Sequence, residues 1–349
     1  KEELYEISHH TGATRPDSWV DVEGGIGTLF AYASMGSREL PSSNVLHEGP
    51  AMALGKRGGF AGTHILVPRG GLAVHINAFN FPIWGLLEKF APSFLAAMPC
   101  IGKPATATSY LTEAVVRMMH ESGLLPDGAI QLVIGSTGDL LDRLGGADVV
   151  TFTGSADTAA KLRANQNLIA NSVPFTAEAD SLNCAILGPD VTPDDPEFDL
   201  FVKEVAREMT GKAGQKCTAI RRVIVPQTMV DAVGERLRER LSKVVVGDPK
   251  IDGVRMGALA SMDQHRDVAE RLAMLASGNE IVHGAGDGFK PLGNSAGAFF
   301  APTLVLCRNA MDNDAVHSVE AFGPVSTLMT YQDIDEAVEL AARGRGSLV

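Results

Sequence analysis

The sequence predicts an α/β protein in which a doubly wound parallel sheet is followed by a second α/β region. Short apolar runs alternate with longer segments of helical periodicity, which is the pattern of strands joined by crossover helices. Polar and glycine-containing motifs follow several of these runs, and ligands of such sheets bind at the carboxyl ends of the strands. The chain has 349 residues, 45% of them hydrophobic, which is enough for two domains with a large core.

In the first half, residues 1–40 mix helical and irregular signals, and Gly24–Gly25 and Pro41 are expected to interrupt the local structure. Residues 39–71 hold short apolar groups separated by Gly and Pro, which indicates an extended hairpin. A doubly wound sheet is then predicted from strands at 72–76, 100–103, 130–134 and 149–152, with helices at 82–95 and 111–122.

In the second half, the alternation continues after an acidic, proline-rich segment at Pro193–Pro196. That change in composition is the best marker of a boundary, so we expect domains at 1–190 and 191–349. The elements predicted beyond it are strands at 223–225 and 280–282 and helices at 230–241 and 263–276.

Charge and composition exclude several classes of function. A formal net charge of -12 argues against nucleic-acid and anionic-membrane partners, which are bound by clustered Lys and Arg. No apolar run is long enough to span a bilayer, and no signal-peptide pattern begins the chain. The nine histidines show no HExxH or HxxxH spacing, so we expect no catalytic metal, and His75 is expected to be a satisfied histidine in its strand.

The four cysteines lie far apart and form no CxxC pair, so neither a disulfide framework nor a zinc site is indicated, which fits a cytoplasmic protein. Cys217 differs from the others because it lies in the glycine-containing stretch Gly211–Thr218, directly after a helical pattern. It is a candidate nucleophile if its surroundings favour the thiolate and a base is near. Taken alone, a cysteine is more often a small buried apolar residue.

Several stretches occur together in a fixed order, and together they resemble the aldehyde dehydrogenase superfamily. Besides GQKC at 214–217, they are Asn77–Pro82, Lys103–Ala105, Phe152–Ser155, Glu178 and Glu320–Pro324. The resemblance covers most of the chain from about Gly71 onward. Five segments are most similar to the dehydrogenase part of the bifunctional ring-opening enzymes of phenylacetate degradation. They are HINAFNFP, KPATAT, VTFTGSA, EADSLNC and AGQKCTAIRR.

The resemblance implies an aldehyde-dehydrogenase-like fold interrupted at both ends. Residues 1–190 would be an NAD(P)-binding domain with an oligomerisation hairpin at about 39–71, and residues 191–349 an incomplete catalytic domain that carries the thiol. It also implies a homo-oligomer and, in a full-length ring-opening enzyme, a further hydratase domain that nothing in this sequence matches.

For the chemistry, the resemblance assigns Cys217 as nucleophile and Glu178 as the base that activates water. The backbone N–H of Cys217 and the side-chain amide of Asn80 would bind the oxyanion. Asn77 is a rival to Asn80, which we prefer because it directly precedes Phe81-Pro82. Glu178 taken alone would be a solvated charge, and Asp180-Ser181 stands beside it where most of the family has Gly-Gly.

For the cofactor, the resemblance assigns pyrophosphate binding to Phe152, Thr153, Gly154 and Ser155, where a strand leads into a helix. No GxGxxG is present. Lys103 would bind the ribose or its phosphate, and Thr106 stands where NAD-preferring members often have Glu, so we expect NADP, with NAD possible as well. Glu320 and Phe322 would hold the nicotinamide ribose, although their motif also fits a turn with a buried aromatic.

The predicted function is NADP-dependent oxidation of an acyl-CoA semialdehyde, with 3-oxo-5,6-dehydrosuberyl-CoA semialdehyde as the expected substrate. The alternatives are the semialdehyde dehydrogenase of the benzoyl-CoA epoxide route, a CoA-acylating dehydrogenase and a non-catalytic scaffold of the same fold. Glu178 argues against the acylating class, whose members generally lack the base. The intact set of Asn80, Glu178 and Cys217 argues against the scaffold.

Overall fold

The computed structural model describes residues 1–284, 289–293 and 296–349, which form two compact units. Unit N consists of Val20–Ala179, and unit C of Lys1–Trp19 together with Asp180–Val349. The division at 179/180 therefore falls eleven residues before the boundary expected at 190/191, and the first nineteen residues pack with the unit that contains Cys217. The functional roles expected of the two regions stay predictions.

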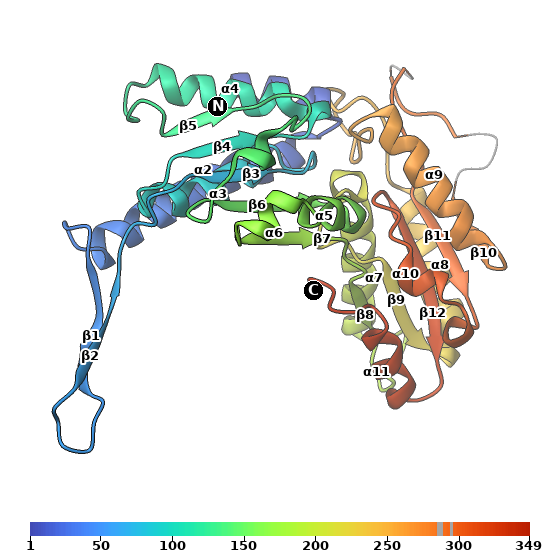
Figure 1. Ribbon diagram of the computed structural model, residues 1–349. Coiled ribbons are helices and arrows are strands. Elements are labelled where there is room, and N and C mark those ends of the chain that lie inside the picture. The colour runs from blue at the N-terminus through green and yellow to red at the C-terminus, as the bar shows by residue number, and fades with distance from the viewer. Residues whose placement is uncertain (285–288, 294–295) are drawn as a thin grey trace. The chain divides into compact units, whose positions relative to one another are not determined.

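The parallel sheet of unit N has the strand order β5-β4-β3-β6-β7 (Figure 1). Its members are β3 (Ala73–Ile76), β4 (Cys100–Lys103), β5 (Ile130–Leu132), β6 (Val149–Gly154) and β7 (Phe175–Ala179), and every pair is parallel. The chain begins at the central strand β3, builds outward to β5, and then returns to the other side with β6. This reversal makes the sheet doubly wound, as predicted, with its switch point between β3 and β6.

Helices cover both faces of this sheet. On one face α3 (Trp84–Leu95) and α4 (Ser109–Glu121) bury Leu86, Phe90 and Val116 against β4 and β5. On the other face α5 (Ala156–Arg163) and α6 (Gln166–Ala170) pack with Val150 of β6. Strands buried on both faces read as apolar runs, which is why the sequence pattern located them well.

A long helix fills most of residues 1–40, where mixed helical and irregular structure was expected. After α1 (Glu2–Ser8), α2 runs from Arg15 to Glu39 without a break at Gly24–Gly25. A Cβ on Gly24 would lie 2.8 Å from the ring of Trp84, and one on Gly25 would lie 3.1 Å from the Cα of Trp84. The two glycines therefore permit close packing of α2 against α3, rather than ending the helix.

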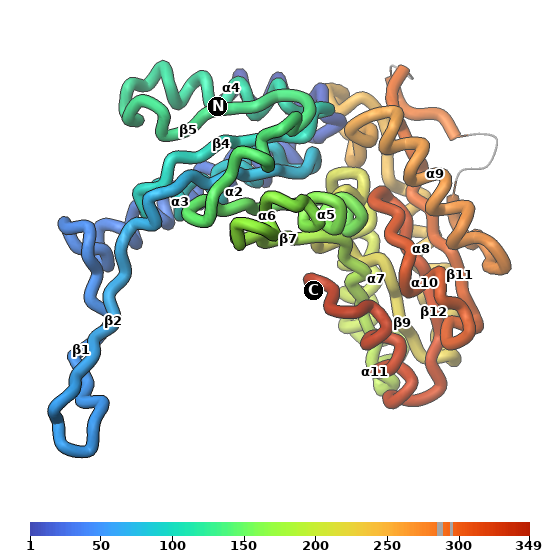
Figure 2. Tube along the Cα trace, in the orientation of Figure 1, coloured from blue at the N-terminus to red at the C-terminus, as the bar shows by residue number. Residues whose placement is uncertain are grey.

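An antiparallel hairpin occupies the segment where one was expected. Its strands are β1 (Leu46–Ala53) and β2 (Ala61–Leu66), and their register shifts between Glu48 and Met52. Figure 2 shows the hairpin projecting as an arm from the sheet of unit N. Its exposed apolar side chains are Met52, Leu54, Phe60, Ile65 and Leu66.

Unit C has a second sheet with the order β10-β11-β12-β9-β8. The strands are β8 (Cys184–Ile186), β9 (Arg222–Pro226), β10 (Glu280–His283), β11 (Thr303–Cys307) and β12 (Val325–Tyr331). Only the edge strand β10 runs antiparallel to its neighbour. The predicted α/β class is therefore confirmed in both units.

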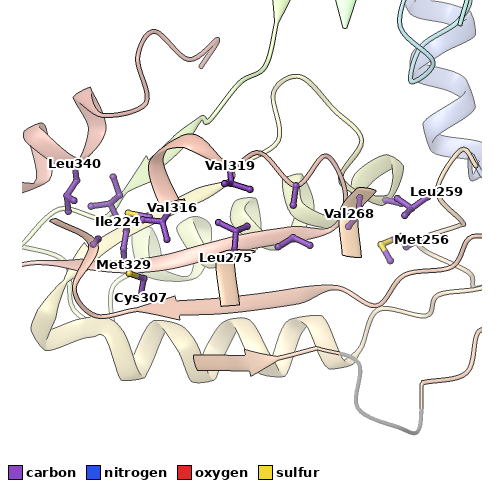
Figure 3. Close-up of a cluster of buried hydrophobic side chains, with 14 of the residues drawn as sticks. Ile224, Met256, Leu259, Val268, Leu275, Cys307, Val316, Val319, Met329 and Leu340 are labelled. Atoms are coloured by element: carbon purple, nitrogen blue, oxygen red, sulfur yellow. The ribbon is translucent and has the colours of Figure 1, made fainter. Parts of the chain in front are cut away.

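Two hydrophobic clusters sandwich the sheet of unit C. One joins it to α7 (Pro196–Thr210) and α8 (Val230–Ser242). The other joins it to α9 (Met262–Ala276), α10 (Ala315–Ser318) and α11 (Ile334–Ala342). Figure 3 shows this second cluster, in which Val268 and Leu275 of α9 gather with strand residues such as Met329. Across the described residues, no helix combines the length and apolar character needed to cross a membrane.

Candidate active-site residues

The residues Gly211–Thr218, here called the thiol loop, leave α7 through an unusual backbone turn. Lys212 and Ala213 both have φ of 52°, and Gly214 has φ of 69°, so three consecutive residues are left-handed. Left-handed φ costs about 1–2 kcal/mol for a residue with a Cβ. A Cβ on Gly214 would in addition lie 2.1 Å from the carbonyl oxygen of Gly323, so only glycine fits there.

Distant segments of unit C hold this turn in place. The backbone N–H of Lys212 donates to Asp17 Oδ1 at 2.8 Å, and Lys212 Nζ donates to Thr11 Oγ1 at 3.1 Å. The buried Gln215 side chain donates to the Lys212 carbonyl and accepts from the N–H of Ala260, both at 3.0 Å. The first nineteen residues thus support the thiol loop, a role that their sequence did not reveal.

Cys217 itself is half-buried, and its backbone is fixed on both sides. Asn183 Nδ2 donates to the Cys217 carbonyl at 2.7 Å. Glu208 of α7 accepts from Lys216 Nζ at 2.6 Å and from Thr218 Oγ1 at 3.4 Å, so both neighbours of the thiol are tied to one carboxylate. The thiol is therefore presented from a well-supported loop.

The other cysteines have different surroundings. Cys100 and Cys307 are buried in strands, and burial raises the pKa of the Cys100 thiol to about 12 and also raises the pKa of Cys307. Cys184 is half-buried in β8. Cys100 and Cys307 therefore behave as small buried apolar residues, whereas Cys217 is a half-buried thiol in a loop.

Glu320 and Phe322 lie in the segment between α10 and β12, and the Glu320 side chain is only 8% exposed. Its Oε2 accepts from the N–H of Ser181 at 3.1 Å, and its Oε1 accepts from Arg221 Nε at 3.3 Å. Burial raises the pKa of Glu320, and the Arg221 charge opposes that rise. The ring of Phe322 is half-buried with the Arg221 guanidinium 5.3 Å from its centroid, so the turn also packs an aromatic.

Arg221 is a functional candidate that the sequence analysis did not single out. Its Nη1 donates to the Gly323 carbonyl at 2.7 Å, and its Nη2 donates to the Gly214 carbonyl at 2.8 Å. Burial lowers its pKa, while the nearby Glu320 carboxylate and Cys217 raise it. The usable signal was Arg221-Arg222 directly before a buried strand, because buried charges have to be paired or hydrogen-bonded.

In unit N, the loop Asn77–Pro82 joins β3 to α3 and is anchored by one hydroxyl just before α4 and one within it. Thr108 Oγ1 donates to the Phe79 carbonyl at 3.1 Å, and Thr112 Oγ1 donates to the Pro82 carbonyl at 3.0 Å. These two hydroxyls hold the backbone on either side of Asn80, whose side chain is buried.

The start of α3, just after this loop, is held by the buried carboxylate of Asp21. It accepts from the N–H groups of Ile83 at 3.1 Å and Trp84 at 2.8 Å, which would otherwise be unsatisfied at the helix start. The rivalry between Asn77 and Asn80 stays open. Among the described residues, the buried side-chain amide of Asn77 has no hydrogen-bond partner, which is unfavourable for a buried polar group. A bound group that paired with this amide would remove that penalty.

The residues predicted to bind pyrophosphate form a strand, a turn and a helix, as expected. β6 ends at Gly154, and Ser155 caps α5, its Oγ accepting from the N–H of Thr158 at 3.3 Å. The Phe152 side chain is buried in the core, so only its backbone can contact a ligand. A Cβ on Gly154 would lie 2.6 Å from that ring, and the Thr153 hydroxyl is buried without a hydrogen-bond partner among the described residues.

Lys103 and Thr106 follow β4. Lys103 is half-buried, its Nζ donates to the Pro104 carbonyl at 3.2 Å, and burial lowers its pKa. Thr106 is exposed and begins a short 3₁₀ turn, Thr106–Thr108, whose N-cap is Ala105. Thr106 is thus open to solvent and does not occupy the capping position.

Glu178 lies in β7, where it pairs with Thr153 of β6, and its side chain is exposed. Because all strands of this sheet are parallel, their carboxyl ends bring Asn77, Lys103, Thr153 and Glu178 to one edge. The exposure fits both a water-activating base and a simple solvated charge, so the role of Glu178 stays a prediction. His75 lies satisfied in β3, 2.8 Å from Thr151 Oγ1 and 3.0 Å from Ser93 Oγ.

The sequence model of the aldehyde dehydrogenase family matches residues 1–348. The chain belongs to the aldehyde dehydrogenase family. It is 48% identical over 350 aligned residues to the 3,4-dehydroadipyl-CoA semialdehyde dehydrogenase of Aromatoleum evansii, covering 99% of this chain and 68% of that protein. Membership in this family of oxidoreductases that act on aldehydes is thereby confirmed.

Solved structures of the aldehyde dehydrogenase family share the fold. Betaine aldehyde dehydrogenase of Staphylococcus aureus in complex with NAD+ gives a TM-score of 0.82 at 23% identity, with 98% of this chain and 65% of that one covered. Succinic semialdehyde dehydrogenase of Streptococcus pyogenes in complex with NADP+ gives 0.82 at 22%, with 97% and 70% covered. The chain spans about two thirds of the length of the relatives it matches. Within the described residues, no group of three or more His, Cys, Asp or Glu side chains could hold a metal ion.

Proposed function

We propose that this aldehyde dehydrogenase oxidises an acyl-CoA semialdehyde to the carboxylic acid, using NADP in preference to NAD. The observation that carries the proposal is Cys217, a half-buried thiol in a loop held by Glu208, Asn183 and Arg221. The 48% identical relative named for a CoA semialdehyde supports the substrate class.

In the proposed mechanism the Cys217 thiolate attacks the aldehyde carbonyl and forms a thiohemiacetal. The side-chain amide of Asn80 and the backbone N–H of Cys217 donate to the oxyanion, each donor being worth about a hundredfold in rate. A nicotinamide cofactor, when bound, would supply the hydride acceptor, and Cys217 would then carry the acyl group as a thioester. Glu178 then takes a proton from water, and the hydroxide attacks the thioester carbonyl carbon. The C–S bond breaks, the acid leaves, and Cys217 returns to the thiolate.

The residues of unit N fit such a cofactor. The strand–turn–helix at Thr153–Ser155 offers backbone N–H groups and a buried hydroxyl that lacks a partner among the described residues. Lys103 offers a cation, and the exposed Thr106 sets no carboxylate beside it. A 2′-phosphate is therefore not repelled at that position, which supports the preference for NADP. In unit C, each carboxylate oxygen of Glu320 accepts a hydrogen bond, from Ser181 or from Arg221, and has capacity to accept another from a ribose hydroxyl.

Two carbon skeletons are candidates for the substrate. The sequence resemblance favours 3-oxo-5,6-dehydrosuberyl-CoA semialdehyde, and the name of the Aromatoleum relative favours 3,4-dehydroadipyl-CoA semialdehyde. Steady-state kcat/KM for both, for the corresponding free aldehydes, and with NADP and NAD, tests the proposal. We expect the CoA-linked aldehydes to be preferred; equal or better turnover of free aldehydes would contradict the substrate class.

We also propose that the β1–β2 hairpin takes part in association of identical subunits, as the family resemblance implies. Its support is the exposed apolar set that includes Met52, Leu54 and Phe60 on a hairpin with little burial of its own. Replacing these three residues with Ser should lower the mass measured by light scattering. A mass equal to that of the wild type would contradict the assignment.

A further inference from the structure

The Arg221 guanidinium connects two segments that the proposed function uses separately. Its Nη2 donates to the Gly214 carbonyl of the thiol loop at 2.8 Å, and lies 3.5 Å from the Lys216 carbonyl. On its other side it meets the Glu320 carboxylate at 3.3 Å through Nε and the Gly323 carbonyl at 2.7 Å through Nη1. The planar fork of arginine suits several acceptors held in fixed directions, which the ammonium of lysine does not match.

Arg221 is also placed to act on the charge of the thiol. Its Nη2 lies 3.5 Å from the carbonyl oxygen of Lys216, the residue directly before Cys217, and the Coulomb interaction between Arg221 and Cys217 favours the charged form of both partners. Both members of the Arg221–Glu320 pair are buried, with side chains 4% and 8% exposed, so water screens them little.

Other charged side chains lie in or near the thiol loop and have partners of their own. Lys216 is paired with Glu208 on α7 at 2.6 Å, and the two charges offset each other. Lys212 donates its ammonium to Thr11 of the N-terminal segment. Asp180 contributes a second negative charge near Glu320. Arg221 is a buried cation that interacts with both Cys217 and the Glu320 carboxylate.

We propose that Arg221 is a positioning residue that ties the Cys217 loop to the Glu320 carboxylate and favours the thiolate form of Cys217. The proposal rests on the proposed function, in which Cys217 attacks the aldehyde and Glu320 holds the nicotinamide ribose. Arg221 would thus influence both the reactivity of the Cys217 thiol and, through Glu320, the position of the nicotinamide ribose.

Arg222 provides a matched control. It is adjacent, also buried, and bonds the carbonyls of Leu182 at 2.8 Å, Leu340 at 2.6 Å and Ala341 at 3.1 Å. Within the part of the chain that the structure describes, none of its side-chain hydrogen bonds reaches Glu320 or the thiol loop. Loss of Arg222 removes a buried arginine of similar structural weight, but not the connection proposed here.

The test is the rate at which iodoacetamide alkylates Cys217 as a function of pH, followed by mass spectrometry of the Cys217 peptide in the intact protein. In Arg221→Met the midpoint of the profile should rise by about one pH unit, because the thiolate loses its cation. In Arg222→Met it should stay at the wild-type value. In Glu320→Gln the midpoint should fall, because Arg221 loses its partner and its positive charge acts on the thiol alone.

A second pair of readouts separates charge from geometry. Arg221→Lys keeps the charge, so its alkylation midpoint should lie within about half a unit of the wild type, while its kcat falls about tenfold because the fork is lost. The dissociation constant for NADP+ should rise about tenfold in Arg221→Met and stay unchanged in Arg222→Met.

An unchanged midpoint in Arg221→Met, or an equal rise in Arg222→Met, would overturn the proposal and leave Arg221 a structural residue only. If Arg221→Met does not fold, two other results still test the proposal: the lower alkylation midpoint in Glu320→Gln, and the nearly unchanged midpoint with reduced kcat in Arg221→Lys. The absence of either result would contradict the proposal. Failure of the proposed function is distinguishable, because it would appear as aldehyde turnover by a protein without the Cys217 thiol, whatever the alkylation profiles show.

Discussion

Replacing Gly214 with Ala should displace the thiol loop, and the structure sets the size of the effect. An alanine at φ 69° costs about 1–2 kcal/mol from the left-handed backbone alone. Its Cβ would lie 2.1 Å from the Gly323 carbonyl oxygen, so the loop has to move by about 1 Å, and overpacking of this kind adds about 1–3 kcal/mol. The total of about 2–5 kcal/mol is within the stability of most domains, so the protein should still fold.

The larger consequence of Gly214→Ala is for activity, because a shift of about 1 Å at a catalytic group costs on the order of a hundredfold in rate. Gly253→Ala is the matched control: Gly253 is in the same unit with φ of 87° and has no atom within 4 Å of an added Cβ. It should lose about 1–2 kcal/mol of stability and keep its activity. Absorbance of the reduced cofactor gives kcat, and thermal unfolding gives stability. Activity of Gly214→Ala within threefold of the wild type, or an equal loss in Gly253→Ala, would refute the reasoning.

Three further predictions concern unit N. Glu178→Gln should keep a burst of reduced cofactor in the first turnover and slow the steady state, because the base is needed only for thioester hydrolysis; loss of the burst as well would show that Glu178 acts on the thiol. Thr106→Glu should shift the ratio of dissociation constants for NADP and NAD toward NAD by about tenfold, or roughly 1.4 kcal/mol, through repulsion of the 2′-phosphate, and an unchanged ratio would contradict it. For His75, burial and the Lys89 charge lower the pKa to about 4. On acidification, His75 is protonated below about pH 6.5 in the unfolded state but only below about pH 4 in the native state. The free energy of unfolding therefore falls by about 3 kcal/mol between these two pH values. Urea unfolding at pH 7 and pH 4.5 should show a smaller acid loss in His75→Gln than in the wild type, and equal losses would exclude this histidine as the cause.

The sequence predicted the sheet of unit N well because buried parallel strands leave a local signal. Strand β4 occupies the predicted residues 100–103, and β6 extends the predicted strand at 149–152 by two residues. The same local logic failed at Gly24–Gly25, where the glycines serve a contact with Trp84, sixty residues away in the chain. A periodicity argument has no access to such a contact.

The candidate site likewise has some residues that sequence motifs indicate and some contacts that only the tertiary structure reveals. Motifs single out Cys217, Glu178 and the turn at Thr153–Ser155 as candidates, because they record the residue types that the proposed chemistry needs. The support of the thiol loop by Asp17, some two hundred residues before it, and the four contacts of Arg221 depend on tertiary placement. The left-handed turn before Cys217 was equally hidden, because Lys212 and Ala213 carry no preference for it.

The central claim is that the Cys217 thiol forms the covalent intermediate. It is tested most directly by rapid mixing of the Cys217→Ala variant with cofactor and an acyl-CoA semialdehyde, with Cys100→Ala, Cys184→Ala and Cys307→Ala as controls. The account predicts no burst and no steady-state production of reduced cofactor in Cys217→Ala, cofactor affinity close to the wild type, and activity retained in the three controls. Appreciable reduction of the cofactor by Cys217→Ala would contradict it.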